Sequence, residues 1–236
     1  MGGVVPPESA RADAPVLGVL MLKTRFPRPA GDIGNPASFA FPVRYRIVAD
    51  ATPQRVVRER AAGLIEPFLA AARALAADGC CAIATSCGFL SLFQAEIAGA
   101  LSVPFASSSL LQLRAINAGL TGGRRAGVIT IAADSLGVDH LLGAGADPAT
   151  PVVGVASDGE FVRAILGDQP EMDVDKLEAE VLEAGMLLLA CHADVGAIVL
   201  ECTNMPPYAD ALRAATGLPV YDVLSLCREM MHRATG

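Results

Sequence analysis

Apolar and polar positions follow two patterns that alternate along the chain. Short apolar runs predict strands at residues 16–22, 43–48, 80–85, 103–106, 126–131, 152–155, 197–200 and 218–221. Between them, apolar positions recur at helical spacing and predict helices at about 52–77, 89–100, 135–142, 174–192 and 206–215, with others reaching 120 and 233. Strands that alternate with helices are typical of parallel sheets, so the predicted fold class is α/β.

The two halves of the chain share this order of elements. Residues 82–111 align without a gap on residues 197–226, at the constant offset that separates Cys87 from Cys202. The identical pairs are Ala82/Ala197, Ile83/Ile198, Cys87/Cys202, Pro104/Pro219 and Leu111/Leu226. We therefore predict two similar Rossmann-like α/β domains with parallel sheets, related by a pseudo-two-fold axis, with the active site in the cleft between them. The first comprises residues 16–108 plus 222–236, the second residues 109–221, and residues 1–15 form a flexible N-terminal tail.

Cys87 and Cys202 each follow an apolar strand directly. Ligands of open α/β sheets bind outside the carboxyl ends of the strands, so both thiols are predicted to face the cleft. A thiolate on one side of a carbon can remove a proton while a thiol on the other side returns one, which inverts a stereocentre. A thiol suits this role because its pKa is about 8.5 and the N-terminus of a following helix lowers that pKa. A small buried hydrophobe is the common alternative for a free cysteine. We expect that fate for the remaining four, Cys80, Cys81, Cys191 and Cys227.

Composition and charge limit the possible partners. Hydrophobic residues make up 53% of the 236 positions and charged residues 18%, which favours a large core. The net charge is −7 and Lys and Arg do not cluster, which argues against a nucleic-acid partner. No apolar stretch is long enough to span a membrane, and the three His and six Cys lack the spacing of a zinc site. A cytoplasmic location with reduced thiols is therefore expected, without a membrane partner and without a metal.

The residues around the two cysteines resemble a known pair of motifs. They read Thr85-Ser86-Cys87-Gly88-Phe89 and Glu201-Cys202-Thr203-Asn204-Met205. Over roughly residues 16–233 the chain resembles the aspartate/glutamate racemase superfamily, which includes hydantoin racemases, maleate isomerase and arylmalonate decarboxylase. The resemblance implies two similar α/β domains with the site between them, no cofactor, and pairing into homodimers.

Two positions depart from the motifs of the amino-acid racemases. Those enzymes usually carry Asn-Thr after the first cysteine, where this chain has Gly88-Phe89, and Gly before the second, where it has Glu201. Gly88-Phe89 is more similar to the hydantoin-racemase side of the superfamily. A decarboxylase of the superfamily keeps one of the two cysteines, so the intact pair favours racemisation or isomerisation.

Residues that flank the cysteines are predicted to bind the substrate. These are Thr85, Ser86, Gly88, Phe89, Thr203 and Asn204, and helix capping is the alternative role for the last two. The resemblance also implies a polar carboxylate-binding residue in the loop after the first strand, for which we choose Asn35; a plain turn before Pro36 is the alternative. Three arginines border the same loop and are interpreted as surface charges, with pairing of one of them to a second acidic group of the substrate as the alternative: Arg25, Arg28 and Arg44. The three histidines are interpreted as surface or helix residues: His140, His192 and His232.

The resulting hypothesis is a cofactor-independent racemase or isomerase of a small carboxylate-bearing substrate (an amino acid, a hydantoin or a related acid). Cys87 and Cys202 exchange the roles of acid and base. The alternatives are a maleate-type cis–trans isomerase, in which Cys87 attacks a double bond and Cys202 supplies a proton, and an arylmalonate-decarboxylase-like enzyme. A non-enzymatic sensor of small acids is a further alternative, and it would keep its affinity after loss of both thiols.

Overall fold

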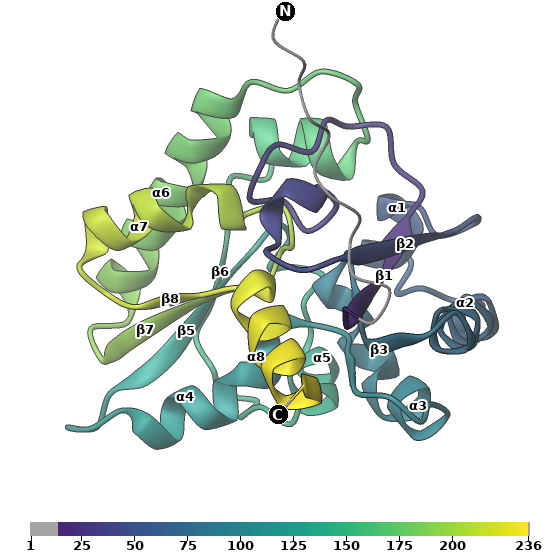
Figure 1. Ribbon diagram of the computed structural model, residues 1–236. Helices are drawn as coiled ribbons and strands as arrows, with labels where there is room; N and C mark the ends of the chain where they lie inside the picture. Colours follow the sequence, from purple (N-terminus) through teal and green to yellow (C-terminus); the bar gives the residue numbers. More distant parts are fainter. Residues whose placement is uncertain (1–13, 236) are drawn as a thin grey trace, which may run out of the picture.

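The computed structural model describes residues 14–235 of the chain; of the predicted tail, residues 1–13 lie outside the described part. Two parallel sheets of four strands run in the orders β2-β1-β3-β4 and β6-β5-β7-β8. The first contains β1 (Val16–Leu22), β2 (Val43–Val48), β3 (Cys80–Thr85) and β4 (Phe105–Ala106). The second contains β5 (Arg125–Thr130), β6 (Val152–Gly154), β7 (Val195–Leu200) and β8 (Val220–Tyr221). Figure 1 shows the sheets in two halves that lie beside each other, which confirms the predicted α/β class.

The strand registers confirm the internal repeat. Leu20 pairs with Thr85 between β1 and β3, and Ile129 pairs with Leu200 between β5 and β7. Both strand pairs also begin with a register irregularity, before Leu17 in one and before Ala126 in the other. Because a parallel register fixes where each strand ends, the two catalytic candidates leave their sheets at equivalent points.

Helices cover both faces of each sheet (Figure 1). The first sheet packs against α2 (Ile65–Ala77), α3 (Gln94–Gly99) and α8 (Val223–Thr235). The second sheet packs against α4 (Leu113–Gly119), α6 (Val174–Cys191) and α7 (Ala209–Thr216). Alternation along β1 explains the two-sided burial, since Leu17 and Val19 contact the α8 side while Leu20 belongs to the core on the opposite face. The C-terminal helix therefore returns to the sheet with which the chain begins.

The helix predicted at 52–77 is two helices, so that prediction was wrong in its middle. Thr52 caps α1 (Pro53–Val57) as expected, because its hydroxyl accepts a hydrogen bond from the backbone N–H of Arg55. The chain then turns through Arg60 and Ala61, which both adopt left-handed backbone angles, before α2 begins. The turn carries Arg58 to Asp134 of the second half, 2.6 Å away, and helical periodicity alone does not reveal such a tertiary contact.

The segments after both cysteines are also tighter than predicted. A 3-10 helix at Gly88–Phe93 precedes α3, and a short 3-10 turn at Pro206–Tyr208 precedes α7. Phe89 is buried by this turn and packs edge-on against His140 of α5 (Val138–Gly143), with ring centroids 5.3 Å apart. His140 is completely buried in α5, so of its two predicted placements, surface or helix, the helical one is confirmed. These contacts join α5 of the second half to the loop that follows the first cysteine.

Candidate active site

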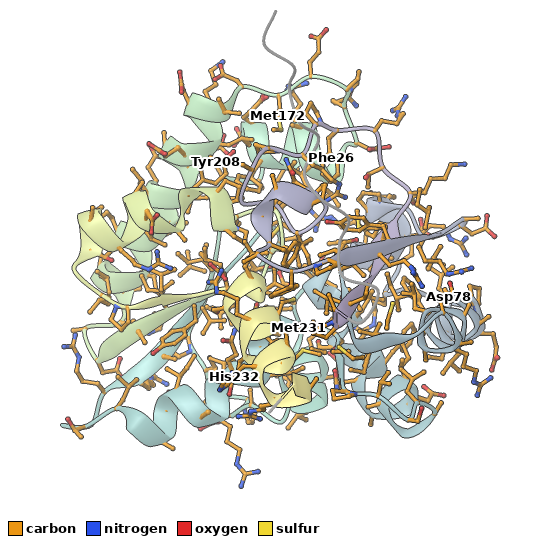
Figure 2. All side chains as sticks on the ribbon, in the orientation of Figure 1. Phe26, Asp78, Met172, Tyr208, Met231 and His232 are labelled. Carbon is orange, nitrogen blue, oxygen red and sulfur yellow. The ribbon has the colours of Figure 1, made fainter. Side chains whose placement is uncertain are left out.

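The ends of β3 and β7 bring Cys87 and Cys202 to one cavity of about 390 Å³. Its polar lining consists of Thr24, Arg28, Ser86, Glu201, Thr203 and Asn204. Its apolar lining consists of Leu22, Phe26, Pro53, Val57, Phe89, Ile131, Ile165 and Leu166, with Gly88 completing the wall. Side chains of both halves therefore line one pocket together with the two thiols. Figure 2 labels Phe26, one residue of its wall.

The turns at the two cysteines have matching hydrogen bonds. The carbonyl of Cys87 accepts from the N–H of Leu90 at 3.2 Å, and that of Cys202 accepts from the N–H of Met205 at 3.1 Å. The halves also touch each other here, since the Thr203 hydroxyl donates to the carbonyl of Ser86 at 2.7 Å. The site is thus built from the two strand ends and from direct contact between them.

Both thiols have a raised pKa, where the sequence predicted a lowered one. Burial raises the pKa of the Cys87 and Cys202 thiols, and the nearby Glu201 carboxylate raises both further. Backbone N–H groups of Phe89 and Asn204 oppose these effects without cancelling them. Both residues are therefore protonated at neutral pH in the free protein, and a thiolate formed here is a strong base.

Glu201 introduces an acidic group that the sequence reasoning did not assign to the site. Its side chain is completely buried, and its Oε2 accepts a hydrogen bond from the Thr130 hydroxyl at 2.7 Å. Burial raises the pKa of Glu201 to about 7, although the Thr130 bond acts in the opposite direction. Its Oε1 atom has no hydrogen-bond partner among residues 14–235.

A second polar cluster holds the loop after β1 against the other half. Asp32 is buried, pairs with the Arg28 guanidinium at 2.7 Å, and accepts from the Asn204 side chain at 2.6 Å. The Arg28 guanidinium also donates to Thr24 and lies 4.6 Å from the centre of the Phe26 ring. Arg28 therefore lines the cavity, and its interpretation as a surface charge was wrong.

The structure brings most, but not all, of the predicted site residues to this cavity. Ser86, Gly88, Phe89, Thr203 and Asn204 line it together with both cysteines. Two predicted residues lie outside the lining. The Asn35 side chain bonds the carbonyl of Arg28 and the N–H of Ala37, which is the turn-capping alternative. The Thr85 hydroxyl donates to the carbonyl of Ser107 beneath the site.

Within residues 14–235, no group of three or more His, Cys, Asp or Glu side chains is placed to hold a metal ion. In the same part of the chain, no helix is long and apolar enough to cross a membrane.

Residues 48–230 match the family model described as Asp/Glu/Hydantoin racemase. The chain belongs to this family. Its fold is also found in unliganded arylmalonate decarboxylase, with a TM-score of 0.61, 18% identity, and coverage of 94% of this chain and 93% of that one. At that identity the likeness supports the fold alone.

Two dimethylsulfoniopropionate lyases are more similar to this chain in sequence than the decarboxylase is. A dimethylsulfoniopropionate lyase of Durusdinium sp. clade D is 33% identical over 88% of this chain and 71% of its own length. Dimethylsulfoniopropionate lyase 6 of Emiliania huxleyi (strain CCMP1516) is 33% identical over 93% of this chain. The chain spans 60% of the length of that second relative.

Proposed function

We propose that this protein is a lyase that eliminates a dialkyl sulfide from a small sulfonio carboxylate, with dimethylsulfoniopropionate as the first substrate to test. The observation that carries the proposal is the pair of buried thiols on one cavity, in a chain 33% identical to a dimethylsulfoniopropionate lyase. Such an elimination needs a base beside the carbon next to the carboxylate, and a thiolate can act as that base.

The reaction balances with the groups of the cavity alone. A thiolate of Cys87 or Cys202 takes one hydrogen from the carbon next to the carboxylate. The electron pair of that C–H bond becomes the new C=C bond, while the C–S bond breaks and its electrons leave with sulfur. The products are dimethyl sulfide, acrylate and a protonated thiol.

Charges near the cavity suit a substrate with one cationic and one anionic end. The two hydrogen bonds of Arg28 to Asp32 and Thr24 leave guanidinium donors free for a substrate carboxylate. A sulfonium cation beside the thiols lowers their pKa, which opposes the effect of burial and Glu201. Substrate binding would then generate the base that the free protein holds as a thiol.

The test is release of dimethyl sulfide into the headspace, measured by gas chromatography, with the wild type and the variants Cys87→Ser and Cys202→Ser. Loss of the base should lower kcat/KM by about a hundredfold or more, the scale of general base catalysis. The matched control is Cys191→Ser, because Cys191 is exposed and should keep full activity. A wild type that releases no dimethyl sulfide above the uncatalysed rate would defeat the proposal.

Racemisation of a small carboxylic acid is the second candidate, favoured by the presence of two thiols rather than one. It requires a base and an acid on opposite sides of one carbon, so replacing either cysteine should abolish it. An elimination requires one base, so the two serine variants should differ in severity. Proton exchange with D₂O, followed by NMR on a panel of amino acids, hydantoins and diacids, separates the two candidates.

A further inference from the structure

The two cysteine sites are equivalent in backbone but differ in one acidic side chain. The repeat places Glu201 opposite Ser86, each directly before its cysteine. Their backbones match, because the N–H of Ser86 donates to the carbonyl of Leu20 at 2.9 Å and that of Glu201 to the carbonyl of Ile129 at 2.8 Å. The cavity therefore has a hydroxyl on one side and a carboxylate on the other.

Room for this carboxylate comes from Gly88 on the opposite half. A Cβ at position 88 would lie 2.9 Å from Cδ and 2.5 Å from the carbonyl oxygen of Glu201, closer than real Cβ atoms approach. The repeat counterpart of Gly88 is Thr203, which has a side chain and bonds the carbonyl of Ser86. The absence of a side chain at Gly88 thus leaves the space that the Glu201 carboxylate occupies at the junction of the two halves.

The carboxylate lacks a partner on one side. Thr130 satisfies Oε2, but Oε1 has no hydrogen bond, and no ion pair with Glu201 exists among residues 14–235. The arginine of the cavity, Arg28, is already paired with Asp32. A buried carboxylate without a counter-charge is unfavourable, so this group is expected either to hold a proton or to meet a cation that enters with the ligand.

We infer that Glu201 is a specificity-determining residue that receives the positively charged end of the substrate. The inference deepens the proposed function and rests on it for the choice of ligand, an onium carboxylate. A sulfonium or quaternary ammonium group has no N–H or O–H to donate, so it is recognised by opposite charge and by apolar or aromatic contact. The cavity wall offers both, because Glu201, Phe89 and Ile131 all line it.

The test compares two ligands of the same shape that differ in one charge. They are 3-(trimethylammonio)propionate and 4,4-dimethylpentanoate, in which carbon replaces nitrogen, and calorimetry measures both dissociation constants without any turnover. The wild type should bind the cationic ligand about tenfold or more tightly, the low end of the coupling between close charges at interfaces. Glu201→Gln should bring the ratio close to one, whereas the control Glu96→Gln, at an exposed position of α3, should leave it unchanged.

Equal binding of the two ligands by the wild type would overturn the inference without any variant. So would an unchanged preference in folded Glu201→Gln protein. If no dimethyl sulfide is released but the preference exists and depends on Glu201, the proposed lyase fails while the cationic subsite stands. If dimethyl sulfide is released and the preference is absent, the proposed lyase stands while the cationic subsite fails.

Discussion

Replacement of Gly88 by alanine should break the contact between the two strand ends. The added Cβ would lie against Oε1, 2.9 Å from Cδ and 2.5 Å from the carbonyl oxygen of Glu201. The carboxylate can turn away, but the carbonyl belongs to the backbone directly after the buried strand β7 and cannot. Overpacking typically costs 1–3 kcal/mol, so we expect a loss of about 3 kcal/mol, the upper end. For a domain of this size that loss lowers Tm by about 6–12 °C.

Thermal and urea unfolding measure this effect, with Gly99→Ala as the matched control. A Cβ at Gly99 meets no atom within 4 Å, so this variant should be as stable as the wild type or gain up to about 1 kcal/mol. Adding Glu201→Ala to Gly88→Ala should recover part of the loss, since the carboxylate clash disappears and the carbonyl clash remains. If Gly88→Ala and Gly99→Ala have the same Tm and the same urea midpoint, the two strand ends do not meet as described.

Three further predictions concern the charges and thiols of the site. The pKa of Glu201, raised from 4.5 to about 7, means that the folded state holds this proton more tightly than the unfolded state. That stabilisation is complete below pH 4.5 and is lost as pH rises to about 7. In urea unfolding, the wild type should therefore lose about 3 kcal/mol of stability relative to Glu201→Gln over this range. Parallel plots of stability against pH for the two proteins would contradict the burial argument. Asp32→Asn leaves the Arg28 charge without its partner and should cost about 3 kcal/mol in the same assay, and an unchanged midpoint would show that the pair is not buried. Because burial raises the pKa of Cys87 and Cys202, a thiol reagent at pH 8 should modify the exposed Cys191 first. Peptide mass spectrometry detects the order of modification. Faster labelling of either cavity cysteine would refute the protonated state of these thiols.

Local patterns in the sequence predicted the sheets and the position of the two cysteines at strand ends, because both depend on short-range order. Apolar runs mark buried parallel strands, and the constant offset between Cys87 and Cys202 reflects the matching registers of β3 and β7. Where the chain turns for a tertiary reason, the same patterns failed. The break after α1 at Arg58 and the 3-10 helix at Gly88–Phe93 allow contacts with the other half. The spacing of apolar residues along the chain does not reveal these contacts.

The site residues that the sequence missed are those whose role depends on a distant partner. Arg28 looks like a surface charge in the sequence, and only the fold places it between Asp32 and the cavity. Asn35 was chosen for its loop, yet its amide bonds the loop itself. Glu201 did carry a signal, since it and Gly88 both depart from the racemase motifs. That the two departures compensate each other sterically becomes visible only when the strand ends meet.

The most direct test of the central claim is a crystal structure of the wild type with 3-(trimethylammonio)propionate, whose amine is a poorer leaving group than a sulfide. We predict the carbon next to the carboxylate within about 3.5 Å of a cavity sulfur, the distance of a reactive contact. The cationic end should face Glu201 and the carboxylate Arg28. A ligand bound away from Cys87 and Cys202, or with its charged ends reversed, would contradict the account.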